Sequence, residues 1–206
     1  MTDTAPAPAA WPRWQRNAVI MAVIVVGLFV VEAVDAALNY SLDQDGIVPR
    51  TVSGLPGILW APFLHVDFAH LIANVLPGAI LGFILLMAGR FLAVTAVVWL
   101  VSGFGVWLIA PAGTVTVGAS GIIFGWLTYL IVRGLFNRRF LQVLGGLALL
   151  VVYGGTLWGV LPQGGSVSWQ GHLFGAIGGV LAAWMLASAD RRAPRGQLEQ
   201  VTTGAR

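Results

Sequence analysis

Long apolar stretches alternate with short polar connections along nearly the whole chain. Each stretch is close to the roughly 20 residues with which an α-helix crosses a hydrocarbon core of about 30 Å. The stretches cover residues 18–38, 70–89, 91–110, 118–133, 140–161 and 170–188. The pattern predicts an all-α, polytopic membrane protein with six transmembrane helices. Its single domain is expected at 18–188, between an N-terminal tail at 1–17 and a C-terminal tail at 189–206.

The composition agrees with an integral membrane protein. Of 206 residues, 58% are hydrophobic and 9% are charged, and the mean hydropathy is +0.86. A soluble domain has about 25% charged residues. The expected surroundings are therefore a lipid bilayer.

The arginines predict the orientation in the membrane, since cytoplasmic segments carry an excess of basic residues. Of the loops on the other side, only that of residues 39–65 carries an arginine, Arg50. This distribution predicts a cell-membrane protein with both tails in the cytoplasm, and it accounts for the pI of about 10.2 without a nucleic-acid partner. The cytoplasmic connections and tails hold Arg13, Arg16, Arg90, Arg133, Arg138, Arg139, Arg191, Arg192 and Arg195.

Two features near the outer side allow more than one interpretation. The loop of residues 39–65 is apolar enough either to pack against the bundle or to dip into lipid. Glu32 and Asp35 lie near the outer end of the first span, where we expect an interfacial cap or a packed polar pair rather than a proton relay.

Glycines at helical spacing predict which spans touch. Gly121 and Gly125 form a GxxxG pattern in the fourth span, and Gly171, Gly175 and Gly179 continue the pattern in the sixth. Because small residues allow two helix backbones to approach closely, the fourth and sixth spans are expected to be in contact.

The few polar side chains within the spans gather at their outer ends. His65 and His70 lie at the start of the second span, and His172 lies at the start of the sixth. Asn74 follows His70 by four residues, which places the two on one helical stripe. Intramembrane polar residues of this kind are by default functional candidates.

Ser120, in the stretch "VTVGASGIIFGW", is on its own best interpreted as a small packing residue. Its depth changes that interpretation. If the fourth span ends at Arg133, Ser120 lies roughly 10 Å below the outer boundary, and if it ends at Asn137, about 5 Å. His172 is expected just inside the same boundary, so the two can share one cavity.

A serine hydroxyl becomes nucleophilic when a base within hydrogen-bond reach accepts its proton. His172 can be that base, while His70, Asn74 and the backbone N–H of Ser120 can stabilise the oxyanion. This set of groups predicts acyl transfer. No acidic third member is evident, because Asp190 lies at the opposite interface, and we interpret the pair as a dyad.

At this point the chain resembles the rhomboid family of intramembrane serine proteases. The resemblance rests on "GASG" with Ser120, "GHLFGAIGG" with His172, and "HVDFAHLIAN" with His65, His70 and Asn74. It implies a six-helix bundle whose short fourth span is surrounded by the others. It further implies Ser120 as nucleophile, His172 as general base and then acid, and His70 with Asn74 as oxyanion-hole donors. Gly118, Gly121 and Gly175 would support this site.

The resemblance also implies single-span membrane proteins as substrates, cut near the outer end of their transmembrane helix, with no cofactor and no metal. Where the family often has a tyrosine, this chain has Phe124, which can stack on His172 but donates no hydrogen bond. Taken without the resemblance, Phe124 and the nine tryptophans are expected mostly to face lipid or the interface. Two other functions remain: an inactive relative that binds transmembrane helices, and a transporter or channel, which the one-sided polar cluster disfavours.

Overall fold

The computed structural model describes residues 11–162 and 167–192. The remaining parts of both expected tails, and residues 163–166 of the last outer connection, lie outside the described residues. No β-strand occurs in the described part, which has a single isolated bridge between Ile47 and Thr116. Its helices are α1 (Arg13–Ala37), η1 (Leu42–Asp45), α2 (Gly57–Trp60), η2 (Ala61–Phe63), α3 (Phe68–Met87), α4 (Phe91–Ile109), α5 (Ser120–Asn137), α6 (Phe140–Tyr153), η3 (Gly154–Val160) and α7 (Trp169–Arg192).

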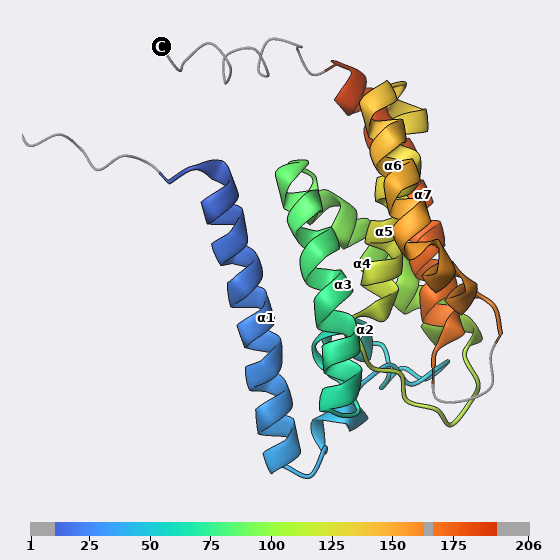
Figure 1. The fold of residues 1–206 in the computed structure, drawn as a ribbon. Helices are drawn as coiled ribbons and strands as arrows, with labels where there is room; N and C mark the ends of the chain where they lie inside the picture. Colours follow the sequence, from blue (N-terminus) through green and yellow to red (C-terminus); the bar gives the residue numbers. More distant parts are fainter. Residues whose placement is uncertain (1–10, 163–166, 193–206) are drawn as a thin grey trace, which may run out of the picture.

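Six helices in the described part are long and apolar enough to cross a membrane, which confirms the predicted six-span all-α fold. They are α1, α3, α4, α5, α6 continued by η3, and α7. The protein is therefore a multi-pass membrane protein. The N-terminal end of α1 and the C-terminal end of α7 lie at the same end of the bundle (Figure 1).

The fourth span is the longer of the two predicted alternatives, because α5 runs past Arg133 to Asn137. The Arg133 guanidinium lies over the ring of Tyr129, 5.9 Å from its centroid, so the charge is accommodated one turn before the helix ends. Arg138, with φ 55°, then terminates the helix. The 18 residues of α5 span about 27 Å, slightly less than a hydrocarbon core of about 30 Å.

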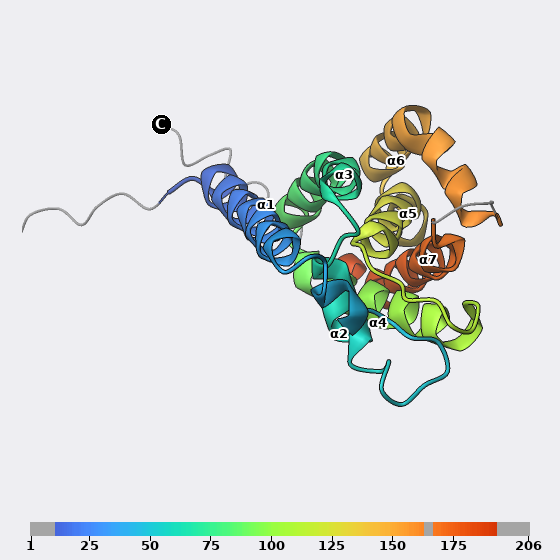
Figure 2. The ribbon, with the colours of Figure 1, turned by 90° about the horizontal axis from the view of Figure 1, so that it is seen from below.

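Helix α5 is the centre of the bundle. Figure 2 shows it surrounded by α3, α4, α6 and α7, while α1 lies outside against α3. Of the six spans it has the largest buried share. The surrounded fourth span that the resemblance implies is thus present.

The predicted contact between the fourth and sixth spans is confirmed and is the most extensive helix pair in the fold. A Cβ atom on Gly175 would collide with the carbonyl oxygen of Gly121, and one on Gly179 would collide with that of Gly125. Thr128 Oγ1 lies 3.0 Å from the carbonyl oxygen of Ala176 across the same contact. Glycine is therefore required on α7 for the two backbones to approach this closely.

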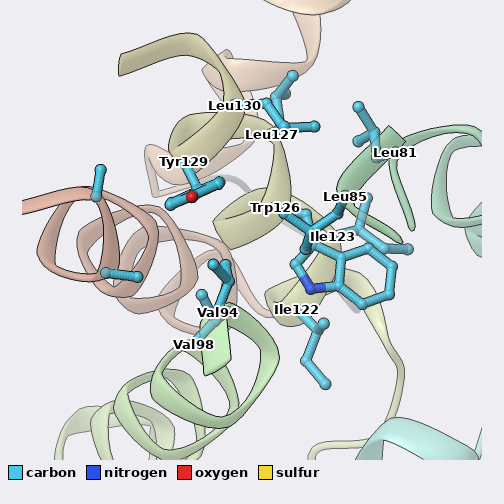
Figure 3. Packing of buried hydrophobic residues seen from close by; sticks show 12 residues of the cluster. Leu81, Leu85, Val94, Val98, Ile122, Ile123, Trp126, Leu127, Tyr129 and Leu130 are labelled. Carbon is cyan, nitrogen blue, oxygen red and sulfur yellow. The ribbon is translucent and has the colours of Figure 1, made fainter. Parts of the chain in front are cut away.

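The apolar core forms around α5, whose side chains point toward several neighbouring helices (Figure 3). Leu81 and Leu85 approach from α3, and Val94 and Val98 from α4. Trp126 is buried among them and donates its indole N–H to Thr95 Oγ1 at 3.0 Å. The expectation of lipid-facing or interfacial tryptophans is wrong for this residue, because its ring fills the space between α5 and its neighbours.

The outer loop of residues 39–65 packs against α4, which decides between the two interpretations of that loop. The indole N–H of Trp99 donates to the carbonyl of Ile58 at 2.6 Å, and that of Trp107 donates to the carbonyl of Thr51 at 2.9 Å. Arg50 donates to the last carbonyls of α4, including that of its C-cap residue Ala110 at 2.7 Å. The loop is therefore fixed to the end of α4 by hydrogen bonds to main-chain oxygens.

The acidic pair of α1 is buried at the junction with this loop. Glu32 and Asp35 are each 1% exposed, and Asp35 Oδ1 accepts a 2.8 Å hydrogen bond from the backbone N–H of Leu42. Asp35 thus caps the chain as it enters η1, as expected for an interfacial cap. Burial, together with the nearby Asp35, raises the pKa of Asp43 to about 6.

Candidate active site

The start of α5 is built by a glycine turn against the second span. Gly118 has φ +116°, a conformation that side chains rarely adopt. A Cβ atom there would lie 2.7 Å from Cε1 of His70, and the Gly118 N–H donates to the carbonyl of Ala61 at 2.8 Å. This turn packs against the His70 ring and places Ser120 at the first position of α5.

A serine on α4 fixes the start of α7. The Ser102 hydroxyl is buried and donates to the carbonyl of Gly171 at 2.9 Å, and a Cβ atom on Gly121 would collide with that hydroxyl. Sequence reasoning missed Ser102, because a single serine within an apolar span gives no sign of the carbonyl that it reaches. The first turns of α5 and α7 therefore both pack against the Ser102 side chain of α4.

Ser120 and His172 form a direct contact. The Ser120 Oγ lies 2.9 Å from Nε2 of His172, and the ring of Phe124 stacks on the imidazole with centroids 4.0 Å apart and planes 6° apart. Phe124 is buried, so the expectation that it faces lipid is wrong: α5 turns this ring toward α7. The stacked arrangement implied by the resemblance is present.

The other imidazole nitrogen determines which tautomer His172 adopts. Nδ1 lies 3.0 Å from the carbonyl oxygen of Gly159, in η3. A carbonyl oxygen only accepts hydrogen bonds, so this contact favours the tautomer with the proton on Nδ1, in which Nε2 has its lone pair available to Ser120. This is the arrangement that a general base requires beside a hydroxyl nucleophile.

His70 and Asn74 line the same cavity as Ser120 and His172, so the structure brings together the four residues that the sequence singled out. Asn74 Nδ2, however, donates to the carbonyl of His70 at 2.8 Å. One N–H of the amide is therefore engaged with its own helix, which leaves the second N–H of the same nitrogen as a donor for another acceptor.

His65 lies behind His70 and is fully buried. Its ring meets that of His70 edge to face, with centroids 5.1 Å apart. Burial, with a smaller contribution from His70, lowers the pKa of His65 to about 4. His65 is not among the residues that line the cavity, so its ring packs behind the site.

The cavity that holds these residues has a volume of about 640 Å³. Its walls come from α3, α4, α5 and α7 and from the loops before α3 and α5. It extends to Leu76 and Pro77 of α3 on one side and to Tyr153 and Thr156 on the other. Among the described lining residues only Asp67 is an acidic or basic side chain apart from the histidines. The space is large enough for a short stretch of extended polypeptide.

Comparisons with known proteins identify the family. The family model of the Rhomboid domain matches residues 54–189. The chain is 44% identical to an uncharacterized protein of Mycobacterium tuberculosis strain H37Rv over 192 residues, which are 88% of this chain and 80% of that protein. It is 44% identical to an uncharacterized protein of Mycobacterium leprae strain TN over 190 residues, which are 87% of this chain and 75% of that protein. With more than half of its length covered by the Rhomboid domain, this chain belongs to the rhomboid family.

Proposed function

We propose that this protein is an intramembrane serine endopeptidase that uses Ser120 and His172 as a catalytic dyad. The observation that carries the proposal is the 2.9 Å contact between Ser120 Oγ and His172 Nε2, in a cavity at the end of the six-span bundle where α5 and α7 begin. Serine, base and cavity together meet the geometric requirements for acyl transfer.

In the proposed reaction, Ser120 Oγ attacks the scissile carbonyl carbon while His172 Nε2 takes the hydroxyl proton. The resulting oxyanion is stabilised by the backbone N–H of Ser120 at the start of α5, by His70 and by Asn74. His172 then donates its proton to the departing amine, which leaves an acyl-enzyme on Ser120. Water attacks the ester with His172 again as base, and the acid product and the free serine are released.

The proposed substrates are membrane-anchored proteins with a single transmembrane helix. Two features support them: the cavity extends between α3 and the junction of α6 with η3, and its surroundings are apolar helices. A substrate helix must unwind locally to present an extended backbone to Ser120, because a helix has no free carbonyl at the reacting position. Because the proposed site lies near the outer ends of α5 and α7, the substrate is cut near the outer end of its own transmembrane helix.

Cleavage of a model single-span substrate in liposomes tests the proposal. The purified wild type is expected to cut the substrate, whereas Ser120→Ala and His172→Ala are expected to have no detectable activity. Ser53→Ala, at an exposed serine of the outer loop, is the matched control and should cut like wild type. Cleavage by Ser120→Ala would refute the dyad. Binding of the substrate by the wild type without any cleavage would favour the inactive relative.

A further inference from the structure

The imidazole of His172 is also held at Nδ1, the ring nitrogen that does not contact Ser120. In a Ser–His–Asp triad, a carboxylate at Nδ1 of the histidine fixes the reactive tautomer and orients the ring. Here the group at Nδ1 is the main-chain carbonyl of Gly159 at 3.0 Å. The only acidic side chain among the described cavity residues, Asp67, accepts a hydrogen bond from the backbone N–H of His70.

The approach of η3 to the imidazole depends on the absence of a side chain at residue 159. A Cβ atom there would lie 2.9 Å from Cζ of Phe124 and 3.1 Å from Nδ1 of His172, both closer than ordinary contacts. Phe124 cannot easily give way, because its buried ring is stacked on the imidazole. A Cβ atom on Gly155, four residues earlier in the same η3, would have no neighbour within 4 Å, so the constraint is local to Gly159.

We propose that Gly159 is a positioning residue whose carbonyl takes the part of the third triad member. It holds the Nδ1 proton of His172, so that Nε2 stays unprotonated and directed at Ser120. The inference rests on the proposed function and extends it to the element η3. Because η3 continues the weakly buried α6 and packs on α7, Ser120 is activated only while η3 is docked against the imidazole.

The kinetic test compares Gly159→Ala with Gly155→Ala. Gly159→Ala is expected to lower kcat by about 100-fold, as a displacement of about 1 Å in a catalytic group does, with KM within about twofold of wild type and slower labelling by a fluorophosphonate. Gly155→Ala should match wild type in all three measurements. Equal kcat values for the two variants would overturn the proposal, as would an effect confined to KM.

A spectroscopic test separates this proposal from the proposed function. ¹⁵N NMR of the His172 ring, assigned by the loss of its signals in His172→Ala, reports the tautomer at about pH 8, where the ring is neutral. Wild type should have the proton on Nδ1, and Gly159→Ala should populate the other tautomer. A wild-type ring protonated on Nε2 refutes the role of Gly159 even if Gly159→Ala does not fold. A chain with the Nδ1 tautomer but no hydrolysis would refute the proposed function alone.

Discussion

Ser102 and Ser120 illustrate how a structural serine differs from a candidate nucleophile. Both lie close to the glycines that join α5 and α7. The hydroxyl of Ser102 is buried and donates to the carbonyl of Gly171, whereas that of Ser120 contacts Nε2 of His172 and lines a cavity. At the scale of single residues, the partner of the hydroxyl therefore determines its chemistry.

Asn74 is expected to act on the transition state. Asn74→Ala should lower kcat by about 10- to 1000-fold, as removal of an oxyanion donor does, and leave the thermal unfolding temperature in detergent nearly unchanged. Its side-chain amide donates to a carbonyl of its own helix, so little stability depends on it. The measurements are steady-state cleavage and thermal unfolding of the same preparations. An unchanged kcat would remove Asn74 from the oxyanion site.

His65 is expected to make stability depend on pH. Its pKa is about 4 when folded and 6.5 in the reference state, so between these values the unfolded chain binds more protons, and stability is lost as pH falls from 6.5 toward 4. The total loss is on the order of 3 kcal/mol. His65→Gln should flatten the decrease of unfolding temperature between about pH 7 and pH 5, and an unaltered slope would contradict the assignment.

Asp43 should change the stability of the fold with pH in the direction opposite to His65, over a similar pH range. Because its folded pKa is raised from 3.8 to about 6, the folded chain binds more protons in that range, and stability falls as pH rises from 3.8 through 6. Asp43→Asn should therefore make the acid destabilisation caused by His65 steeper. This is checked by the same series of unfolding temperatures, and a shallower slope in Asp43→Asn would exclude a protonated Asp43 in the folded state.

At the scale of elements, the glycine contact between α5 and α7 sets the distance between Ser120 and His172. The two residues lie at the first turns of these helices, and α5 contributes the carbonyls that a larger residue on α7 would strike. The distance between the two side chains thus depends on helix packing, in addition to the glycine turn before α5.

Gly175→Ala tests this dependence. Its Cβ atom would collide with the carbonyl of Gly121, and such overpacking costs about 1–3 kcal/mol, so the unfolding temperature should fall and cleavage should be lost. Gly145→Ala, on α6 with nothing within 4 Å, should be neutral or stabilising, since alanine is the better helix former. Equal unfolding temperatures for the two variants would mean that the helices tolerate separation.

The limits of sequence reasoning follow from the kind of interaction involved. The six spans, the α5–α7 contact and the gathering of Ser120 with His172 were predictable, because hydropathy, glycine spacing and helix depth are properties of local sequence. The roles of Ser102 and Gly159 were not, since both depend on main-chain carbonyls, which every residue possesses. The end of α5 was also ambiguous, because an arginine stacked on Tyr129 can remain within a helix.

At the scale of the whole molecule, the two ends of the bundle differ in chemistry. The cavity lies at the end where α5 and α7 begin, together with Asp43, Asp67 and the buried pair of α1. The opposite end carries the arginines at the start of α1 and between α5 and α6 (Figure 1). Because basic residues gather on the cytoplasmic side of membrane proteins, we expect the arginine-rich end to face the cytoplasm and the cavity to open on the other side.

Cysteine labelling tests the orientation, since the chain has no cysteine of its own. In intact cells, a membrane-impermeant maleimide should label Ser53→Cys, on an exposed part of the outer loop, and should leave Thr2→Cys unlabelled until the cells are lysed. The expectation follows from the arginine distribution. Labelling of Thr2→Cys in intact cells would place the N-terminus outside.

The activation of Ser120 by His172 is tested most directly by the reaction of the protein in a bilayer with a fluorophosphonate, followed by mass spectrometry of the labelled peptide. We expect a single adduct on Ser120 in the wild type and none in Ser120→Ala or His172→Ala. An unlabelled wild type that is folded, or an adduct of equal yield in His172→Ala, would contradict the claim that His172 activates Ser120.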